Sequence, residues 1–423
     1  MEKMWRIVAI GTVFLFVSSV VMFAGGRAEP VEDEVRHIRL WQHLDAPDEP
    51  YFYDLIDRFN QEHPDIEVEF ELVPWGGAYD LYTTSLVAGD AADVIFYATP
   101  AWGSAFWEMG VLEPLDDYVA EWPGADQIVD VAWEGSRAAP DEPIFGVPIM
   151  TLPGYLYYRA DWFEQLGLDP PETREDFLEA AKRISEEIDG AYGFGMRGAR
   201  GGTGMMLSFV LPAVDNQWFD ADGRSTFRRP EAIEAARWYV DLFREHGVTP
   251  PSAPSDGFSE IIEGFQSGLT GMLVHHIMSA EGHVAALGDD AVGISKMPSV
   301  NGERWVEAGM HHYVIARDSQ HKDAAFTFVS WMTEPEQAAF YGRYVGAIPV
   351  VENVEEVEPY FAENRFARTA AESTAFAYNP PYIETLGEFW EQSWPANFQR
   401  ALIGEISVEE MMEQFARTVE GRQ

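Results

Sequence analysis

Three large aromatic side chains stand at or just beyond the ends of two expected strands. Trp41 closes a strand expected over residues 35–41, Tyr97 closes another expected over residues 94–97, and Trp102 follows in the next loop. Aromatic ring faces are typical walls of small-molecule sites, where they pack on the apolar faces of a ligand. The alternative is that each ring packs under its own loop as core. Because three rings occupy corresponding positions, we favour a shared binding crevice.

A glycine-rich stretch carries two arginines that could donate hydrogen bonds to a ligand. Residues 193–198 read GFGMRG and satisfy the G-x-G-x-x-G pattern of dinucleotide-binding loops. That function requires a helix to begin at the third glycine, whereas a second glycine loop, residues 201–204, follows here, so we do not expect NAD binding. The guanidinium groups of Arg197 and Arg200 could instead bond hydroxyl oxygens, or the carboxylate of a sugar acid. The alternative is that both arginines are solvated at the surface.

Two pairs of adjacent histidines raise the question of a metal site. His275 and His276 end one apolar strand, and His311 and His312 lie in another. Neighbouring residues on a strand point to opposite faces, so each pair offers at most one ligand per face, and zinc would need partners from elsewhere. We therefore expect no metal; from the residues alone, the rings lie in the core, at the surface or against a ligand.

The acidic residues predict neither a calcium loop nor a catalytic pair. Asp220, Asp222 and Glu231 have the spacing of calcium-loop positions 1, 3 and 12, but Arg224 and Ser225 stand where an acidic or amide ligand and a glycine belong. A hairpin turn is the simpler interpretation. Among 71 acidic residues no spacing singles out a pair for acid–base work, and the sequence has no G-x-S-x-G motif, no P-loop and no cysteine. We expect no cofactor.

The charge balance excludes several classes of partner. The 423 residues include 71 acidic and 28 basic side chains, which give a formal net charge of -43. Such a surface repels nucleic-acid phosphates and anionic lipids, so we expect neither as a partner. Self-repulsion at low salt should cost stability and added ions should screen it, so we expect a salt-adapted protein.

The N-terminal residues are typical of an export signal. Lys3 and Arg6 give a positive start, residues 7–23 are uncharged and apolar, and residues 24–28 supply small side chains for cleavage. An uncleaved membrane anchor is the alternative, because about 17 apolar residues approach the length of a span. We expect a signal peptide over residues 1–28 that is removed on export.

The first part of the mature chain alternates strands and helices. After the strand at residues 35–41 we expect a helix over 51–63, a strand over 66–73, a helix over 79–88 and a strand over 94–97. This order is the signature of a parallel sheet wrapped by helices, in which ligands bind at the carboxyl ends of the strands. The aromatic residues at those ends therefore lie where a ligand site is expected.

A second pattern begins beyond residues 148–153, a proline-bracketed extended stretch that we interpret as a linker between domains. A strand over 155–158 opens it, a helix over 174–188 follows with Thr173 as its N-cap, and further strands and helices continue to the end. Two domains are expected for a chain of this length.

Seven segments, in this order, resemble the extracellular solute-binding proteins of carbohydrate ABC transporters, family 1, the group that includes maltose-binding protein. They are YDLIDRFNQEHPDIEVEF, TTSLVAGDAADVIF, GVLEPLDDYV, IFGVPIMTLPGYLYYRADWFEQLGLDPPETREDFLEAAKRI, GFQSGLTGMLV, GISKMPSVNGE and AFTFVSWMTEPEQAAFYGRYVGAIPV. Their ordered succession covers nearly the whole mature chain. The sequence departs from the family pattern in two ways. It lacks the lipid-anchor cysteine of Gram-positive members, and it has His275-His276-Ile277 where the family often has a tryptophan after the GxxxM strand.

The resemblance implies an α/β fold of two Rossmann-like lobes joined by a hinge, the type II periplasmic binding protein architecture. We expect the N-terminal lobe to comprise residues 35–147 and 300–335, and the C-terminal lobe to comprise 148–299 and 336–423. Sugar would bind in the cleft between the lobes. Without an anchoring cysteine, the protein is expected free in the periplasm.

The resemblance also implies a function and a set of contacts. We expect a monomeric protein that is not an enzyme, captures a sugar or polyol and delivers it to the transmembrane subunits of an ABC permease; a secreted, glycoside hydrolase-like enzyme with an aromatic cleft is the alternative. Tyr382 lies where the family often places a sugar-stacking aromatic. The expected ligand-binding residues are Trp41, His43, Tyr97, Trp102, Tyr155, Arg197, Arg200, Trp218, His275, His276 and Tyr382.

Overall fold

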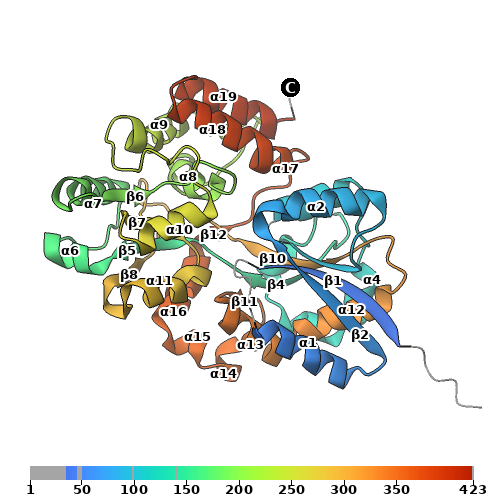
Figure 1. Cartoon of the computed structure of the whole chain (residues 1–423). Helices are drawn as coiled ribbons and strands as arrows, with labels where there is room; N and C mark the ends of the chain where they lie inside the picture. The colour runs from blue at the N-terminus through green and yellow to red at the C-terminus, as the bar shows by residue number, and fades with distance from the viewer. Residues whose placement is uncertain (1–34, 45–49, 98–99, 140, 422–423) are drawn as a thin grey trace, which may run out of the picture. The chain divides into compact units, whose positions relative to one another are not determined.

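Two separate β-sheets organise the part of the chain that the computed structural model describes, residues 35–44, 50–97, 100–139 and 141–421 (Figure 1). The first sheet has six strands in the order β11-β4-β10-β3-β1-β2, and the second has four in the order β6-β7-β5-β8. A short parallel pairing joins β9 (Val306–Glu307) to β12 (Ala377–Tyr378). The expected α/β class is confirmed.

The parallel half of the six-stranded sheet follows the expected order of elements. It runs through β1 (Arg36–Leu44), α1 (Pro50–Glu62), β2 (Ile66–Pro74), α2 (Trp75–Ala88) and β3 (Val94–Tyr97). Strands β2 and β3 both pair with β1 in parallel. Helix α2 starts earlier than expected, directly after β2, because two glycines near its N-terminus hid the start of the helical pattern.

The other half of this sheet comes from distant parts of the chain. Strands β4 (Val147–Thr151), β10 (Met310–Ile315) and β11 (Ile348–Pro349) pair in antiparallel fashion. The stretch interpreted as a linker is therefore largely strand β4, all of whose residues are buried. Pro148 fits there because it faces β10 where the register shifts between His311 and His312.

The four-stranded sheet is built from β5 (Tyr155–Arg159), β6 (Tyr192–Gly195), β7 (Thr270–His275) and β8 (Val292–Ser295). Strands β6 and β7 are parallel, whereas β5 is antiparallel to both β7 and β8. The N-cap expected at Thr173 is confirmed: its hydroxyl accepts the Asp176 N–H at 3.2 Å, and the Asp176 carboxylate accepts the Thr173 N–H at 3.0 Å.

Helices cover both sheets and form a separate layer near the C-terminus, where α9, α18 and α19 gather (Figure 1). The helices not yet given are α3 (Pro100–Glu108), α4 (Asp116–Glu121), α5 (Asp130–Glu134), α6 (Ala160–Leu166), α7 (Arg174–Glu187), α8 (Thr203–Val210), α9 (Pro230–Arg244), α10 (Phe258–Gln266), α11 (Ala280–Leu287), α12 (Lys322–Met332), α13 (Pro335–Val345), α14 (Val354–Val357), α15 (Tyr360–Glu363), α16 (Arg365–Ser373), α17 (Leu386–Glu388), α18 (Trp394–Leu402) and α19 (Val408–Val419). A π-helical turn, Phe389–Ser393, joins α17 to α18. Within the described residues, no helix has the length and apolar character needed to cross a membrane.

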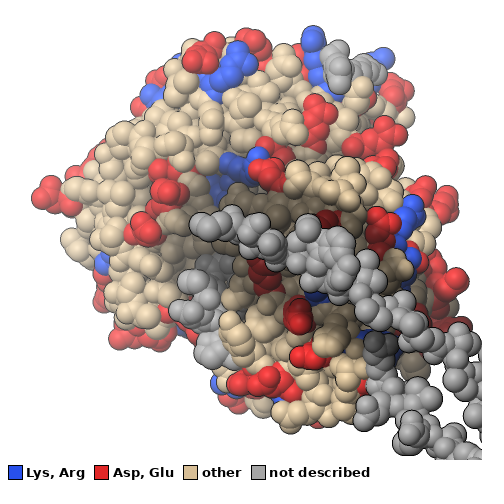
Figure 2. Space-filling model, turned by 45° about the vertical axis from the view of Figure 1, so that its right-hand side comes forward, with Lys and Arg blue, Asp and Glu red and all other residues tan. Residues whose placement is uncertain are grey.

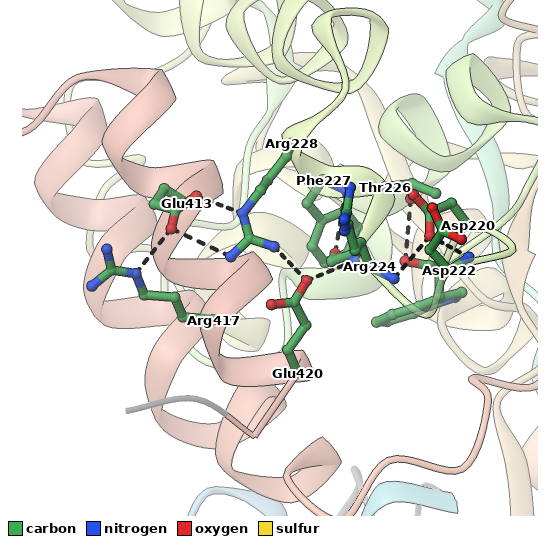
Figure 3. Close-up of polar contacts among 11 residues, drawn as sticks. Asp220, Asp222, Arg224, Thr226, Phe227, Arg228, Glu413, Arg417 and Glu420 are labelled. Atoms are coloured by element: carbon green, nitrogen blue, oxygen red, sulfur yellow. Dashed lines mark hydrogen bonds and ion pairs between the residues drawn. The ribbon is translucent and has the colours of Figure 1, made fainter.

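The segment considered as a calcium loop is a turn closed by its own aspartate (Figure 3). The Asp220 carboxylate accepts the backbone N–H groups of Asp222 and Arg224, both at 2.9 Å. Its oxygen is thus used inside the turn, as the hairpin interpretation expects.

Arg228, just beyond this turn, ties the segment to α19 (Figure 3). Its guanidinium lies 2.7 Å from the Glu413 carboxylate and also pairs with Glu420. Arg417 approaches Glu413 from the next helical turn at 2.9 Å. We call Arg228, Glu413, Arg417 and Glu420 the α19 ion-pair cluster.

Candidate functional site

A cavity lies between the ends of the two sheets. Phe96 on β3, Met150 on β4 and His311 on β10 line it from the six-stranded sheet, and Val274 and His275 on β7 line it from the four-stranded sheet. It encloses about 1200 Å³ of free space, part of which is open to solvent. Its mostly apolar and aromatic walls with a few polar groups are typical of small-molecule sites.

The glycine-rich loop after β6 holds two charged groups of the cavity close to its backbone. Gly201 has a φ of +88°, and a Cβ there would lie 2.3 Å from Nη2 of Arg197. A Cβ on Gly204 would lie 2.6 Å from a carboxylate oxygen of Glu307. The glycines therefore serve close packing of Arg197 and Glu307 rather than a dinucleotide phosphate.

Glu391 joins three elements at one end of the cavity. The indole Nε1–H of Trp102, on α3, donates to Oε1 of Glu391 at 2.9 Å. Nε of Arg200, on the glycine-rich loop, lies 3.1 Å from the other carboxylate oxygen. Burial raises the pKa of Glu391, while these two partners oppose that shift. The carboxylate is thus a buried junction between α3, the loop and the π-helical turn.

Glu307 is a second carboxyl group in the cavity, carried on β9. Burial raises its pKa to about 7, with repulsion from Glu391 adding to the rise and Arg197 opposing it. Within the described chain its carboxyl has no hydrogen bond or ion pair. Near neutral pH it is divided between an acid that donates and a carboxylate that accepts.

Three histidines of the cavity are held neutral. Burial lowers the pKa of His276 to about 3 and that of His311 to about 4, and it lowers the pKa of His275 well below the ordinary value. The His311 ring stacks on Phe96 at 5.3 Å between centroids and donates from Nδ1 to the carbonyl of Gly309 at 2.7 Å. Neutral imidazoles can each offer one acceptor nitrogen to hydroxyl groups.

The structure brings four of the expected ligand-binding residues together in this cavity: Arg197, Arg200, His275 and His276. Trp102 lies beside it and lines a neighbouring hollow that Arg197 and Arg200 share. Its ring stacks on Trp75 at 4.9 Å. Trp102 stands on α3 rather than in a loop, because Pro100 begins a helix instead of ending a strand.

Tyr97 and Trp41 do not line the cavity but pack in the interior. The Tyr97 ring lies flat on His312 at 5.0 Å, and the Trp41 ring stacks on Tyr82 of α2 at 5.8 Å. The reason is strand alternation: Phe96 and His311 point into the cavity, so Tyr97 and its cross-strand partner His312 point to the opposite face.

Of the remaining expected residues, three do not line the cavity, and the side chain of the fourth is not among those that the structure describes. Tyr155 is fully buried with its hydroxyl 2.9 Å from that of Tyr157, and Trp218 stacks on Trp390 at 6.0 Å. Tyr382 is 41 % exposed and donates its hydroxyl to Glu108. The side chain of His43 lies outside the described residues.

Several lining residues had no place in the sequence interpretation. Trp75 follows strand β2, so the strand-end rule that selected Trp41 could have found it. Glu307 and Glu391 carry no local signal among 71 acidic residues. The other members missed include Phe258 and Tyr341, and Trp390, four residues before Trp394, has the spacing of a helix core stripe but lines the cavity. Within the described residues, no cluster of three or more histidine, aspartate or glutamate side chains could hold a metal ion.

Comparison with protein families gives one clear match. The model of the bacterial extracellular solute-binding protein family matches residues 45–339. The chain is also similar to the mannitol-binding protein of Pseudomonas aeruginosa, with 28% identity over 74% of each chain. A putative binding protein of Brucella abortus is 26% identical over 74% of this chain and 76% of its own.

Solved structures show the same fold at low identity. A solute-binding protein of Thermotoga lettingae bound with α-D-tagatose superimposes with a TM-score of 0.82 at 23% identity, over 91% of this chain and 99% of that one. An Agrobacterium radiobacter protein in complex with ribitol gives a TM-score of 0.78 at 20% identity, over 92% and 99%. The fold is that of the type II periplasmic sugar-binding proteins.

Proposed function

Because the chain belongs to the family of bacterial extracellular solute-binding proteins, we propose that it captures a sugar or polyol between its two sheets and delivers it to an ABC permease. The observation that carries this proposal is the cavity, to which both sheets contribute aromatic and apolar walls together with hydrogen-bonding groups. The relatives named for mannitol binding and solved with tagatose or ribitol support the same ligand class.

The chemistry of the cavity suits a polyhydroxylated ligand. Phe96, Trp75 and Trp390 offer ring surfaces for C–H groups. Glu307 and the neutral histidines offer hydrogen-bond partners to hydroxyl groups, and Arg197 and Arg200 offer donors. A micromolar affinity needs about 8 kcal/mol, which several such contacts supply.

We assign the lobes and their movement to the same proposal. Residues 35–147 and 300–335 would form the N-terminal lobe, and residues 148–299 and 336–423 the C-terminal lobe. Strands β4 and β11, which this division gives to the C-terminal lobe, pair within the six-stranded sheet, so the boundaries would fall after these two strands. Closure on the ligand requires that the closed state binds it better than the open state. Arg197, Arg200, His275 and His276 would contact the ligand, and Trp102 would border it.

The exported state is also a proposal. The expected signal peptide, residues 1–28, lies outside the described residues. We propose that it is cleaved, that the protein is a monomer free in the periplasm, and that it acts without metal, cofactor or nucleic acid.

Acidic side chains are spread widely over the face shown in Figure 2, where basic ones are fewer. We therefore expect the melting temperature to rise from low to molar NaCl, and a flat profile would count against salt adaptation.

A second candidate function is glycoside hydrolysis. It is favoured by the two carboxyl groups in one cavity, Glu307 and Glu391, whose pKa values are both raised by burial. Incubation with oligosaccharides separates the two functions, since an enzyme releases product whereas a binding protein returns the sugar intact.

The proposed function is tested by a thermal-shift screen of the mature protein in high salt. We expect at least one of mannitol, ribitol, tagatose and maltose to raise the melting temperature and to be recovered unchanged. No shift with any sugar, polyol or sugar acid would contradict the proposal, and cleavage of an oligosaccharide would favour the enzyme.

A further inference from the structure

The turn that follows β7 places a serine under the histidine at the end of that strand. β7 ends at His275, and a 3₁₀ turn, Ile277–Ser279, brings Ser279 back toward it. The Ser279 hydroxyl oxygen lies 3.0 Å from Nδ1 of His275, and both side chains are 7 % exposed. His275 lines the ligand cavity, whereas Ser279 lies behind it.

The hydrogen bonds of the turn use the one hydroxyl hydrogen of Ser279. This hydroxyl donates to the carbonyl oxygen of His276 at 3.1 Å, which also accepts the hydroxyl of Tyr157 at 3.0 Å. When the Ser279 hydrogen points at that carbonyl, which can only accept, the Ser279 oxygen meets Nδ1 of His275 as an acceptor. In that arrangement the hydrogen in the contact comes from the imidazole.

We propose that Ser279 is a positioning residue that holds His275 in the Nδ1–H tautomer, so that the unprotonated Nε2 is presented to the ligand cavity as a hydrogen-bond acceptor. Nε2 has no partner within the described residues. The ligand must then donate a hydrogen bond at this point, as a hydroxyl group does. A ligand with a methylene or an ether oxygen there leaves the nitrogen unsatisfied and is rejected.

The electrostatics of the site agree with this assignment. Burial lowers the pKa of His275 well below its ordinary value, so the ring is neutral and has one N–H at neutral pH. Repulsion from His276, His283 and Arg197 acts in the same direction. A backbone hydrogen bond with His276 acts to raise the pKa, as a carbonyl oxygen beside a ring N–H does.

The tautomer is tested directly by ¹⁵N NMR of the ligand-free, histidine-labelled protein, with His275 assigned by its absence in His275→Gln. We expect the wild-type ring to show a protonated Nδ1 and an unprotonated Nε2. Ser279→Ala should populate the Nε2–H tautomer, and Ser279→Thr, which restores a hydroxyl, should return the wild-type pattern. An Nε2–H tautomer in the wild type, or an unchanged tautomer in Ser279→Ala, would overturn the proposal.

The effect on binding rests on the proposed function and is measured separately, by calorimetric titration with ribitol, mannitol, tagatose and maltose. We expect Ser279→Ala to weaken the binding of whichever of them the wild type takes by about tenfold, and Ser279→Thr to recover it. Ser373→Ala is the matched control, because it removes a buried hydroxyl that bonds only within its own helix among the described residues. An affinity loss in Ser279→Ala that Thr does not recover would overturn the positioning role. If no probe binds the wild type, the proposed function fails while the spectra still decide the tautomer.

Discussion

The ligand cavity and the α19 ion-pair cluster use the same residue types in opposite ways. In the cluster, Glu413 is held by Arg228 and Arg417 at a partly exposed position, and these partners lower its pKa. In the cavity, burial raises the pKa of Glu391 and of Glu307, although arginines lie nearby. In the cluster, the ion pairs join two segments of the chain. In the cavity, carboxyl groups are buried at an energetic cost, at positions where a ligand can contact them.

The largest expected effect comes from removing the junction carboxylate. Glu391→Ala removes the acceptor of the buried Trp102 indole N–H, a loss of about 1–3 kcal/mol, and the ion-pair partner of Arg200, whose side chain is 44% exposed. We expect ligand affinity to fall about 30-fold by calorimetry, which corresponds to about 2 kcal/mol. Glu413→Ala in the α19 ion-pair cluster is the control, and we expect it to leave ligand affinity unchanged. Equal affinities in the two variants would show that Glu391 has no special role in ligand binding.

The next effect concerns Trp102. Its side chain is 2 % exposed, so truncation to alanine would cost about 3–5 kcal/mol of stability and obscure any change in binding. Trp102→Phe keeps an aromatic ring beside Trp75 but removes the N–H donated to Glu391. We expect about a tenfold loss of affinity with a smaller loss of stability. Unchanged affinity would show that the hydrogen bond between Trp102 and Glu391 does not contribute to ligand binding.

Glu307 makes the stability of the protein depend on pH in a way that the partly exposed carboxylate Glu413 does not. Its pKa rises on folding from 4.5 to about 7, so the folded state retains a proton that the unfolded state releases between these values. The stability that this proton gives is fully present below about pH 4.5 and is lost as the pH rises through about 7, with an upper size of about 3 kcal/mol. Urea unfolding of the wild type and of Glu307→Gln measures it.

We expect Glu307→Gln to lose less stability than the wild type between about pH 5 and about pH 8, because the amide does not titrate. Parallel pH profiles for the two proteins would show that the carboxyl group is not desolvated in the folded state.

The smallest effect is expected in the α19 cluster. Arg417→Ala removes the pair to Glu413, whose two side chains are 51% and 37% exposed, and such a pair contributes about 1 kcal/mol or less. We expect a small drop in melting temperature that shrinks further in high salt, with unchanged ligand affinity. A change in affinity would mean that the cluster is coupled to the cavity.

The fold could be predicted from the sequence because its signals are local. The alternation over residues 66–73 predicted strand β2, and the N-cap at Thr173 predicted the start of helix α7. The ordered family segments predicted the two-sheet α/β fold. The stretch at Pro148 misled because its bracketing prolines were interpreted as marking a linker between domains, whereas a register shift on the neighbouring strand accommodates Pro148 within β4.

The cavity could be predicted only in part, because side-chain direction depends on the strand partner. Arg197, Arg200, His275 and His276 were found from their residue types at strand ends and loops, and the cavity contains them. Tyr97 was selected where its neighbour Phe96 faces the cavity, a difference of one residue that reverses the face. Glu307 and Glu391 gain their properties from burial among distant segments, which no local pattern encodes.

The central claim is that a hydroxylated ligand is held between the two sheets by groups from each. It is tested most directly by the crystal structure of the mature protein with the sugar or polyol that gives the largest thermal shift. The account predicts ligand density in the cavity, in contact with Arg197 and His275 from one side and with Phe96 or His311 from the other. Density at another surface, with the cavity empty, would contradict it.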